Sequence, residues 1–339
     1  MARARRAAEP GAPRARRDRH PARRRGGAPA RAASIAIPRA RGDVELDVGG
    51  RRVRLTNLDK LFFPEIGATK GDLLQYYVAV ASVLLPHLRD RAMVMKRYPN
   101  GAAGDFFFMK RAPRPRPEWL TTCAIEHASG SVIDFPVIDD LAALLWVVNL
   151  GCIDLNQWYA RCDDVDRPDY LHFDLDPVGE VAFATVREAA LVVNETLQGL
   201  GMPTWVKTTG SRGLHVYVPI VRGPTQKQVW GVSKAIALDV ARHHPRLLTA
   251  VYKKAARPLG RVLVDYNQNA WGRTLASVYS VRPRPRATVS TPVSWDEVTR
   301  GFTIEDFRMD NVPTRVAALG DLWAPLTRSR GHFDLARLA

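Results

Sequence analysis

The sequence predicts a mixed α/β protein, and two patterns support this fold class. Short stretches of alternating apolar and polar residues, typical of strands, lie at 171–176, 205–220 and 261–269. Longer segments with apolar residues three and four positions apart, typical of helices, lie at 69–85, 185–200 and 225–243. This alternation predicts a sheet covered by helices.

Positive charge is concentrated at the N-terminus. The chain has 339 residues and a net charge of +16, and residues 1–42 contain 13 arginines against Glu9 and Asp18. Because this segment has almost no large apolar side chain, we expect 1–42 to be a disordered basic tail and 43–339 to form a single compact catalytic unit. Three interpretations of the tail stay open: binding to phosphate backbones, a misassigned start codon, or a transit peptide.

The sequence indicates a cytoplasmic location. No run of about 18 apolar residues is present, so no membrane span is expected, and there is no signal-peptide core. Three irregularly spaced cysteines, Cys123, Cys152 and Cys162, are typical of free buried thiols in a reducing compartment.

A strand with two carboxylates is the most informative element. In 171–176 the alternation directs Leu171, Phe173 and Leu175 to one face. His172, Asp174 and Asp176 then share the other face, and we expect Pro177 to end the strand. Two neighbouring carboxylates favour a bound cation, and magnesium or manganese prefers such ligands. The alternative is a strand that simply runs into a turn.

Other elements follow in order along the chain. We expect a hairpin over 44–55, a helix that Thr69 caps and that ends before Pro86, a strand over 93–98, and a stiff connector at 112–117. A strand over 131–138 and a helix over 139–150 follow. Thr185 and Glu188 predict a capping box for the next helix, and 290–339 is expected to close the fold.

Cations and aromatic residues lie before the acidic strand. Lys60 precedes the first helix and Lys70 opens it, a position that favours an anion more than helix stability, although two solvated lysines are the alternative. Lys96 and Arg97 lie near three consecutive aromatic residues, 106–108. At least one of these is a candidate for base stacking, unless the strand is buried on both faces.

A glycine-bracketed loop and a third carboxylate come after the acidic strand. Residues 209–213, Thr-Gly-Ser-Arg-Gly, form a small turn whose backbone N–H groups could approach phosphate oxygens, although a plain hairpin is the alternative. His215 follows on the polar face of the next strand. Asp265 ends the strand over 261–269.

The order Asp174-Leu-Asp176, Gly210-Ser-Arg-Gly-Leu-His215 and Val264-Asp265 resembles the three motifs of the archaeo-eukaryotic primase superfamily. The likeness covers about 44–325 and is strongest to the polymerase domain of bacterial ligase D, in its stand-alone primase-polymerase C form. It implies a primase-like core with a sheet of the RNA-recognition-motif kind and an N-terminal α/β part.

The resemblance also implies an activity and a site. The activity is template-directed filling of short 5′-phosphorylated DNA gaps during repair, with ribonucleotides preferred, and two Mn²⁺ or Mg²⁺ ions held by Asp174, Asp176 and Asp265. The implied nucleoside triphosphate (NTP or dNTP) ligands are Lys96, Asn156, Thr209, Ser211, Arg212, His215, Gln268 and Arg282. The implied DNA contacts are Lys60, Lys70, Arg97, Phe107 and Phe108, with Lys60 and Lys70 at the 5′-phosphate.

Two departures and three alternatives accompany this expectation. Asn156 stands where ligase D relatives often have His, and Arg212 replaces a frequent Lys. An end-joining polymerase or primase that acts with a separate Ku and ligase is one alternative. A two-metal nuclease and an inactive nucleic-acid-binding module are the others.

Overall fold

The computed structural model describes residues 15–17, 35–328 and 330–338. It confirms a mixed α/β fold, and its centre is a six-stranded sheet in the order β16-β17-β13-β15-β14-β19. The strands are β13 (Tyr170–Val178), β14 (Trp205–Thr208), β15 (Leu214–Pro219), β16 (Leu248–Thr249), β17 (Arg261–Asp265) and β19 (Pro292–Val293).

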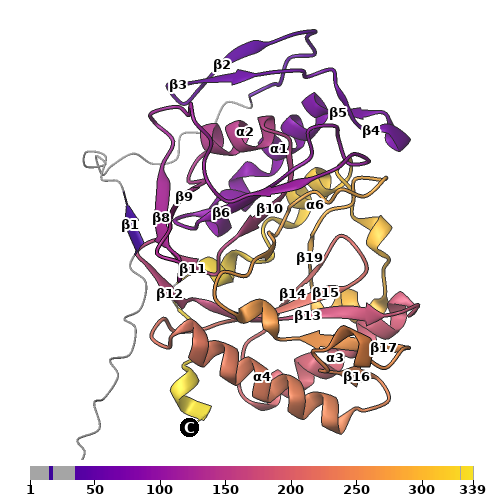
Figure 1. The fold of residues 1–339 in the computed structure, drawn as a ribbon. Coiled ribbons are helices and arrows are strands. Elements are labelled where there is room, and N and C mark those ends of the chain that lie inside the picture. The colour runs from indigo at the N-terminus through magenta and orange to yellow at the C-terminus, as the bar shows by residue number, and fades with distance from the viewer. Residues whose placement is uncertain (1–14, 18–34, 329, 339) are drawn as a thin grey trace, which may run out of the picture.

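Two helices cover one face of this sheet. They are α3 (Phe183–Gly199) and α4 (Gln226–His243), and both contact β13 and β17 (Figure 1). The chain order β13-α3-β14-β15-α4-β17 is a βαββαβ arrangement with strand order β17-β13-β15-β14, which is the expected RNA-recognition-motif kind. Leu171, Phe173 and Leu175 are buried in the core that this sheet shares with the helices.

A second sheet lies on the N-terminal side, in the order β18-β10-β6-β7. Its strands are β6 (Met93–Arg97), β7 (Phe107–Met109), β10 (Cys152–Gln157) and β18 (Leu275–Ala276). Helices α1 (Lys70–Leu88) and α2 (Leu141–Asn149) pack against each other, and α2 contacts β10 (Figure 1). Because β18 comes from the C-terminal part of the chain, this second sheet joins segments that are distant in sequence.

Smaller elements complete the fold. The hairpins are β2 (Val44–Val48) with β3 (Arg51–Leu55), β4 (Leu61–Phe63) with β5 (Ala68–Thr69), and β11 (Ala160–Arg161) with β12 (Asp164–Pro168). A third sheet joins β1 (Ala15–Arg17), β8 (Thr122–Glu126) and β9 (Val132–Pro136). The remaining helices are α5 (Trp295–Arg300), α6 (Val312–Leu319) and the 3₁₀ turns η1 (Pro64–Ile66), η2 (Lys254–Ala256), η3 (Asn267–Asn269), η4 (Ile304–Asp306), η5 (Ala324–Thr327) and η6 (Leu335–Leu338).

Most of the predicted basic tail, 1–14 and 18–34, lies outside the described residues. Ala15–Arg17 form β1, whose backbone pairs with β8, and this pairing needs no large apolar side chain. The division into a tail and one compact catalytic unit stays a prediction. Within the described chain, every helix is too short or too polar to serve as a membrane span, and the three cysteines are buried and form no disulfide.

Three predicted boundaries were wrong. The strand β13 continues through Pro177. This residue pairs with Val262 of β17 and has no partner on β15, whose pairing with β13 ends at Leu175, so a proline is tolerated there. Helix α1 begins after the predicted cap Thr69 but runs past Pro86 to Leu88, because its last turn is buried in the core.

The capping box that was predicted for the third helix is also wrong. Helix α3 begins at Phe183, and its cap residue, Ala182, makes no side-chain cap hydrogen bond. The Phe183 ring packs 5.6 Å from that of Phe302, so tertiary packing extends the helix before Thr185.

Candidate active site

The acidic residues of three separate segments meet on the open face of the six-stranded sheet. Asp174 on β13 lies directly opposite Asp265 on β17 and His215 on β15. Residues that face each other on antiparallel strands have Cα atoms about 4.5–5.5 Å apart. Asp176 lies two residues further along β13, on the same face. The structure therefore brings the three predicted carboxylates together.

Burial and mutual repulsion make this cluster unfavourable without a cation. Burial first, and then the charge of Asp265, raise the pKa of Asp174 to about 7. The charge of Asp174, followed by burial and the charge of Asp265, raises the pKa of Asp176 to about 7. Oδ1 of Asp174 is buried without a hydrogen bond, although Nε2 of His215 lies 3.1 Å away. A bound cation would relieve both effects.

The carboxylates have other partners as they stand. Asp265 accepts hydrogen bonds from the Asn267 backbone N–H (2.8 Å) and from Nε2 of Gln268 (3.2 Å). Among the described residues, no group of three or more His, Cys, Asp or Glu side chains is arranged to hold a metal ion. The donor set is nevertheless hard oxygen, which is the type that magnesium and manganese prefer, and one of these oxygens has no hydrogen bond.

A cavity of about 660 Å³ lies beside the carboxylates. It brings together Asp174, Asp176 and all eight residues predicted to bind the nucleotide, which are Lys96, Asn156, Thr209, Ser211, Arg212, His215, Gln268 and Arg282. These residues come from four strands (β6, β10, β13 and β15), two loops and the turn η3, so their convergence is a tertiary result. The cavity is lined by both cationic side chains and carboxylates.

Sequence analysis missed several residues of this cavity: Lys110, Asp154, Arg273 and Arg284. Asp154 is 1 % exposed, and its Oδ2 lies 3.8 Å from Nζ of Lys96 and 3.9 Å from Nε of Arg282. It therefore holds two of the predicted phosphate ligands in place. The strand alternation that puts Asp154 on the same face as Asn156 could have indicated it.

The glycine-bracketed loop is ordered by Thr209. The Thr209 hydroxyl accepts hydrogen bonds from the backbone N–H groups of Ser211 (3.0 Å) and Gly213 (3.1 Å). Two N–H groups expected to approach phosphate are thus already bonded, because this short polar side chain reaches back over the turn. A Cβ at Gly213 would collide with the carbonyl oxygen of Leu175, and Gly210 has a φ of +65°. Both glycines are required by this geometry.

A buried lysine fixes His215. Nζ of Lys207 donates to Oγ of Ser290 (2.6 Å) and to the carbonyl oxygen of Ala276 (3.0 Å), and it lies within hydrogen-bond distance of Nδ1 of His215 (2.7 Å). Burial lowers the pKa of Lys207. The contact with Lys207 holds the imidazole ring so that its Nε2 faces Asp174. Lys207 was not predicted as a site residue. The strand register, which places it directly opposite His215, is the observation that identifies it.

The aromatic residues lie on a strand edge and are not buried. Phe106, Phe107 and Phe108 are 50 %, 43 % and 62 % exposed, so a strand buried on both faces is wrong. Lys96 faces Phe108 and Arg97 faces Phe107 across β6 and β7, on alternate faces. Phe108 lines the cavity, whereas Phe107 lies 5.3 Å from the guanidinium of Arg97. The two rings therefore cannot form one continuous stacking platform.

Lys60 and Lys70 lie outside the cavity. Nζ of Lys60 donates to the Pro99 carbonyl oxygen (2.7 Å) and to Oδ1 of Asn100 (3.0 Å) and is exposed. Lys70 is buried, and its Nζ donates to the carbonyl oxygen of Thr56 (2.7 Å). Burial, followed by the charge of Lys60, lowers the pKa of Lys70 to about 8. The two cations are therefore close enough to repel each other.

Comparison with known protein families identifies the family to which this chain belongs. Residues 69–323 match the model of the LigD primase-polymerase domain. The chain belongs to this family. Members of this family are metal-dependent nucleotidyltransferases that use nucleoside triphosphates, so the nuclease alternative has no support.

Related proteins agree with this assignment. The chain is 35 % identical to the multifunctional non-homologous end joining protein LigD of Mycolicibacterium smegmatis, over 81 % of this chain and 36 % of the relative. The LigD of Pseudomonas aeruginosa is 29 % identical over 88 % of this chain and 36 % of the relative. The chain thus spans about a third of these proteins.

A solved structure is similar over most of the chain. The polymerase domain of Mycobacterium tuberculosis ligase D, in complex with DNA, superposes with a TM-score of 0.77. It is 33 % identical in sequence, and the match covers 81 % of this chain and 98 % of that domain. This LigD-type domain therefore has the expected primase-polymerase fold.

Proposed function

We propose that this LigD-type domain extends a DNA primer by templated nucleotide addition across short gaps that carry a 5′-phosphate. The observation that supports this most strongly is the row Asp265, Asp174 and His215 beside a cation-lined cavity. Carboxylates and cations that line one cavity suit a metal-bound triphosphate. The M. tuberculosis domain, which is in complex with DNA, supports a DNA substrate for this chain.

The residues divide the work of the reaction. Asp174, Asp176 and Asp265 would hold two divalent ions, Mn²⁺ or Mg²⁺. Bound ions of this kind activate the primer 3′-hydroxyl and stabilise the leaving pyrophosphate. Lys96, Arg212, Arg282 and the missed Arg284 would neutralise the triphosphate, because guanidinium forks pair with phosphate oxygens. Phe108 would stack against a template or nucleotide base.

Asn156 and His215 would complete the nucleotide site. His215 would present its Nε2 to the nucleotide, and Asn156 offers a neutral amide on β10. Thr209 would act by ordering the loop that presents Ser211 and Arg212. Gln268 would orient Asp265, to which it already donates.

The repair context follows from the relatives. Those relatives are named as non-homologous end joining proteins, so we place this domain in DNA-end or gap repair, in the cytoplasm and near the nucleoid. A ligase and Ku would act as separate partners. Ribonucleotides are proposed as the preferred substrates.

Primer extension tests the proposal. A duplex with a short gap and a 5′-phosphate is incubated with NTPs or dNTPs and with Mn²⁺ or Mg²⁺. We expect addition of the templated nucleotide, faster with NTPs and with Mn²⁺. Absence of extension under all conditions, with DNA still bound, would instead support an inactive binding module.

The 5′-phosphate role of the two lysines gives a second prediction. We expect Lys60→Ala, alone and combined with Lys70→Ala, to weaken binding of 5′-phosphorylated gaps on the order of tenfold at low salt and to leave unphosphorylated gaps unaffected. Because the pKa of Lys70 is about 8, the phosphate-dependent part of the affinity should be full below pH 8 and fall as the pH rises above it. Anisotropy titrations with both DNAs measure this.

The matched control is Lys227→Ala, which removes a lysine from α4, on the opposite face of the six-stranded sheet. If the Lys60 variant bound phosphorylated and unphosphorylated DNA with equally weakened affinity, these lysines would be general contacts to the DNA backbone.

A further inference from the structure

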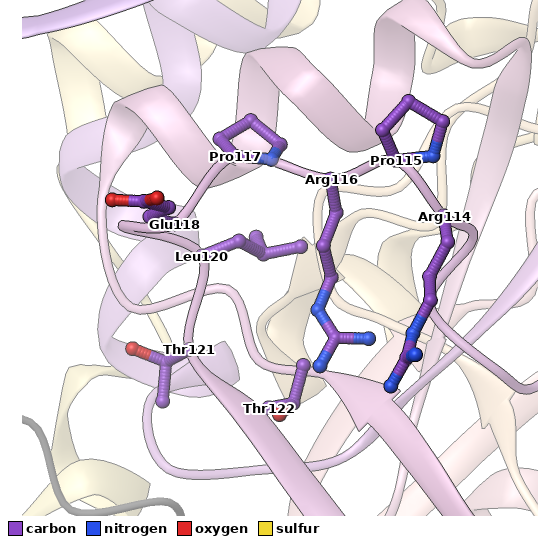
Figure 2. Close-up of a pocket in the computed structure, with 8 residues that line it drawn as sticks. All are labelled: Arg114, Pro115, Arg116, Pro117, Glu118, Leu120, Thr121 and Thr122. Atoms are coloured by element: carbon purple, nitrogen blue, oxygen red, sulfur yellow. The ribbon is translucent and has the colours of Figure 1, made fainter.

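A second cavity lies outside the active site, in the segment that joins β7 to β8. It has a volume of about 490 Å³ and is lined by residues 114–118 and 120–122. Figure 2 shows the guanidinium groups of Arg114 and Arg116 extending in the same direction, towards Thr122, while the Glu118 carboxylate points away from them. Two cations therefore share one open space.

These two arginines have no partner within the described chain, and their neighbours do. Arg51 pairs with Asp140, and Arg111 donates to the carbonyl oxygen of Val132 (2.8 Å). Neither Arg114 nor Arg116 forms a hydrogen bond or ion pair with any residue that the structure describes. Their charges are thus available to a ligand that is absent from the fold itself.

The backbone of this segment is restricted. Pro113, Pro115 and Pro117 alternate with Ala112, Arg114 and Arg116, and each proline ring fixes its own φ. The Ala112 backbone N–H donates to the Asp134 carbonyl oxygen (2.8 Å), and the Leu120 N–H closes a local turn by donating to the carbonyl oxygen of Pro117 (3.1 Å). Binding a ligand there therefore costs little backbone entropy, and ordering the two arginine side chains is the main entropic cost.

The chemistry of the cavity suits phosphate. Guanidinium groups present paired N–H donors that match phosphate oxygens. Thr121 and Thr122 line the same cavity. Two forks that face one space suit a chain of phosphates better than a single small anion.

The position of the cavity selects the source of those phosphates. Phe108 and Lys110 line the active-site cavity, and Arg114 is four residues further on. Four residues span at most about 14 Å, and successive phosphates on one strand of a duplex advance by about 3.4 Å along the helix axis. A strand that leaves the active site over Phe108 would therefore reach Arg114 within a few nucleotides.

We propose that Arg114 and Arg116 bind the backbone phosphates of the single-stranded template where it leaves the active site. This inference deepens the proposed function and depends on it for the direction of the strand. The Pro–Arg segment thereby adds a sequence-independent anchor for an overhanging template.

Fluorescence anisotropy of the full chain tests this without metal or nucleotide. The DNAs are duplexes with template overhangs of increasing length, each with and without a 5′-phosphate. We expect Arg114→Ala combined with Arg116→Ala to weaken binding of long overhangs on the order of tenfold at about 0.1 M salt, and to leave blunt duplexes unchanged. The slope of log K against log salt should fall by about 1.4, which corresponds to two phosphate contacts on a single strand.

Two controls keep the result specific. Arg242→Ala with Arg246→Ala removes the same charge from exposed positions at and beyond the end of α4, which covers the opposite face of the sheet. Arg114→Lys with Arg116→Lys keeps the charge and loses the forks, so it should restore the salt slope and only part of the affinity. Equal melting temperatures would show that each variant is folded.

Several outcomes would overturn the proposal. One is equal weakening by the two alanine pairs, and another is no weakening by the Arg114 and Arg116 pair. An effect confined to DNA with a 5′-phosphate would identify a terminal-phosphate site instead of a strand path. If the wild-type chain binds overhangs but never extends a primer, the proposed function fails while this binding test still decides the inference.

Discussion

Asp174→Asn is expected to reduce primer extension by about three orders of magnitude. Metal ions contribute several kcal/mol of transition-state stabilisation, and each 1.4 kcal/mol is about tenfold in rate. Asp174 is the central residue of the row, opposite both Asp265 and His215, so its loss affects every metal position that the three carboxylates could form. Single-turnover extension of a gapped duplex at saturating nucleotide measures the effect, and Asp176→Asn and Asp265→Asn should behave similarly.

A buried carboxylate elsewhere provides the control. Asp169 is buried against Arg91, at 2.7 Å, and lies outside the active-site cavity. Asp169→Asn should lower the melting temperature but leave extension per folded molecule within a few-fold of wild type. If Asp174→Asn extended primers within tenfold of wild type, the carboxylate row would not be the catalytic centre.

The same substitution is expected to stabilise the protein when no divalent metal is present. The pKa values of Asp174 and Asp176 are raised from 3.8 to about 7 in the folded state. The unfolded chain therefore releases these protons near pH 4, whereas the folded chain holds them until near pH 7. The free energy of unfolding therefore falls by a few kcal/mol as the pH rises from about 4 to about 7. Above pH 7 these two groups cause no further change.

Asp174→Asn removes one of these charges and the repulsion that it exerts on Asp176. In EDTA the variant should melt above wild type at pH 7.5, and the difference should shrink towards pH 4. Manganese should raise the melting temperature of wild type more than that of the variant. Thermal melts at several pH values measure this difference between variant and wild type. The difference is more informative than either melting curve alone, because Asp169 and Asp321 have lowered pKa values and make the protein more stable as the pH rises.

A variant that melted lower than wild type in EDTA at every pH would contradict this account of the cluster. The expected pair of results, higher stability and lost extension, is the usual relation between a strained site and its function.

Local patterns in the sequence determined the elements that carry the site. The alternation in 171–176 predicted which side chains of β13 enter the core and which face the open side, because a strand has a period of two. The glycines at 210 and 213 were visible as a tight turn, and the structure shows why no Cβ is accommodated there. The three motifs together were sufficient to predict the family, which the comparisons confirm.

Only the tertiary structure decided how residues from different segments act on one another. Asp154 is a structural partner of Lys96 and Arg282, Lys207 holds the ring of His215, and Phe107 and Phe108 point to different faces. No local pattern encodes these relations, because they depend on the register between strands that are far apart in sequence. The periodicity of one segment fixes which way its own side chains point, whereas their neighbours are fixed only when the sheets are assembled.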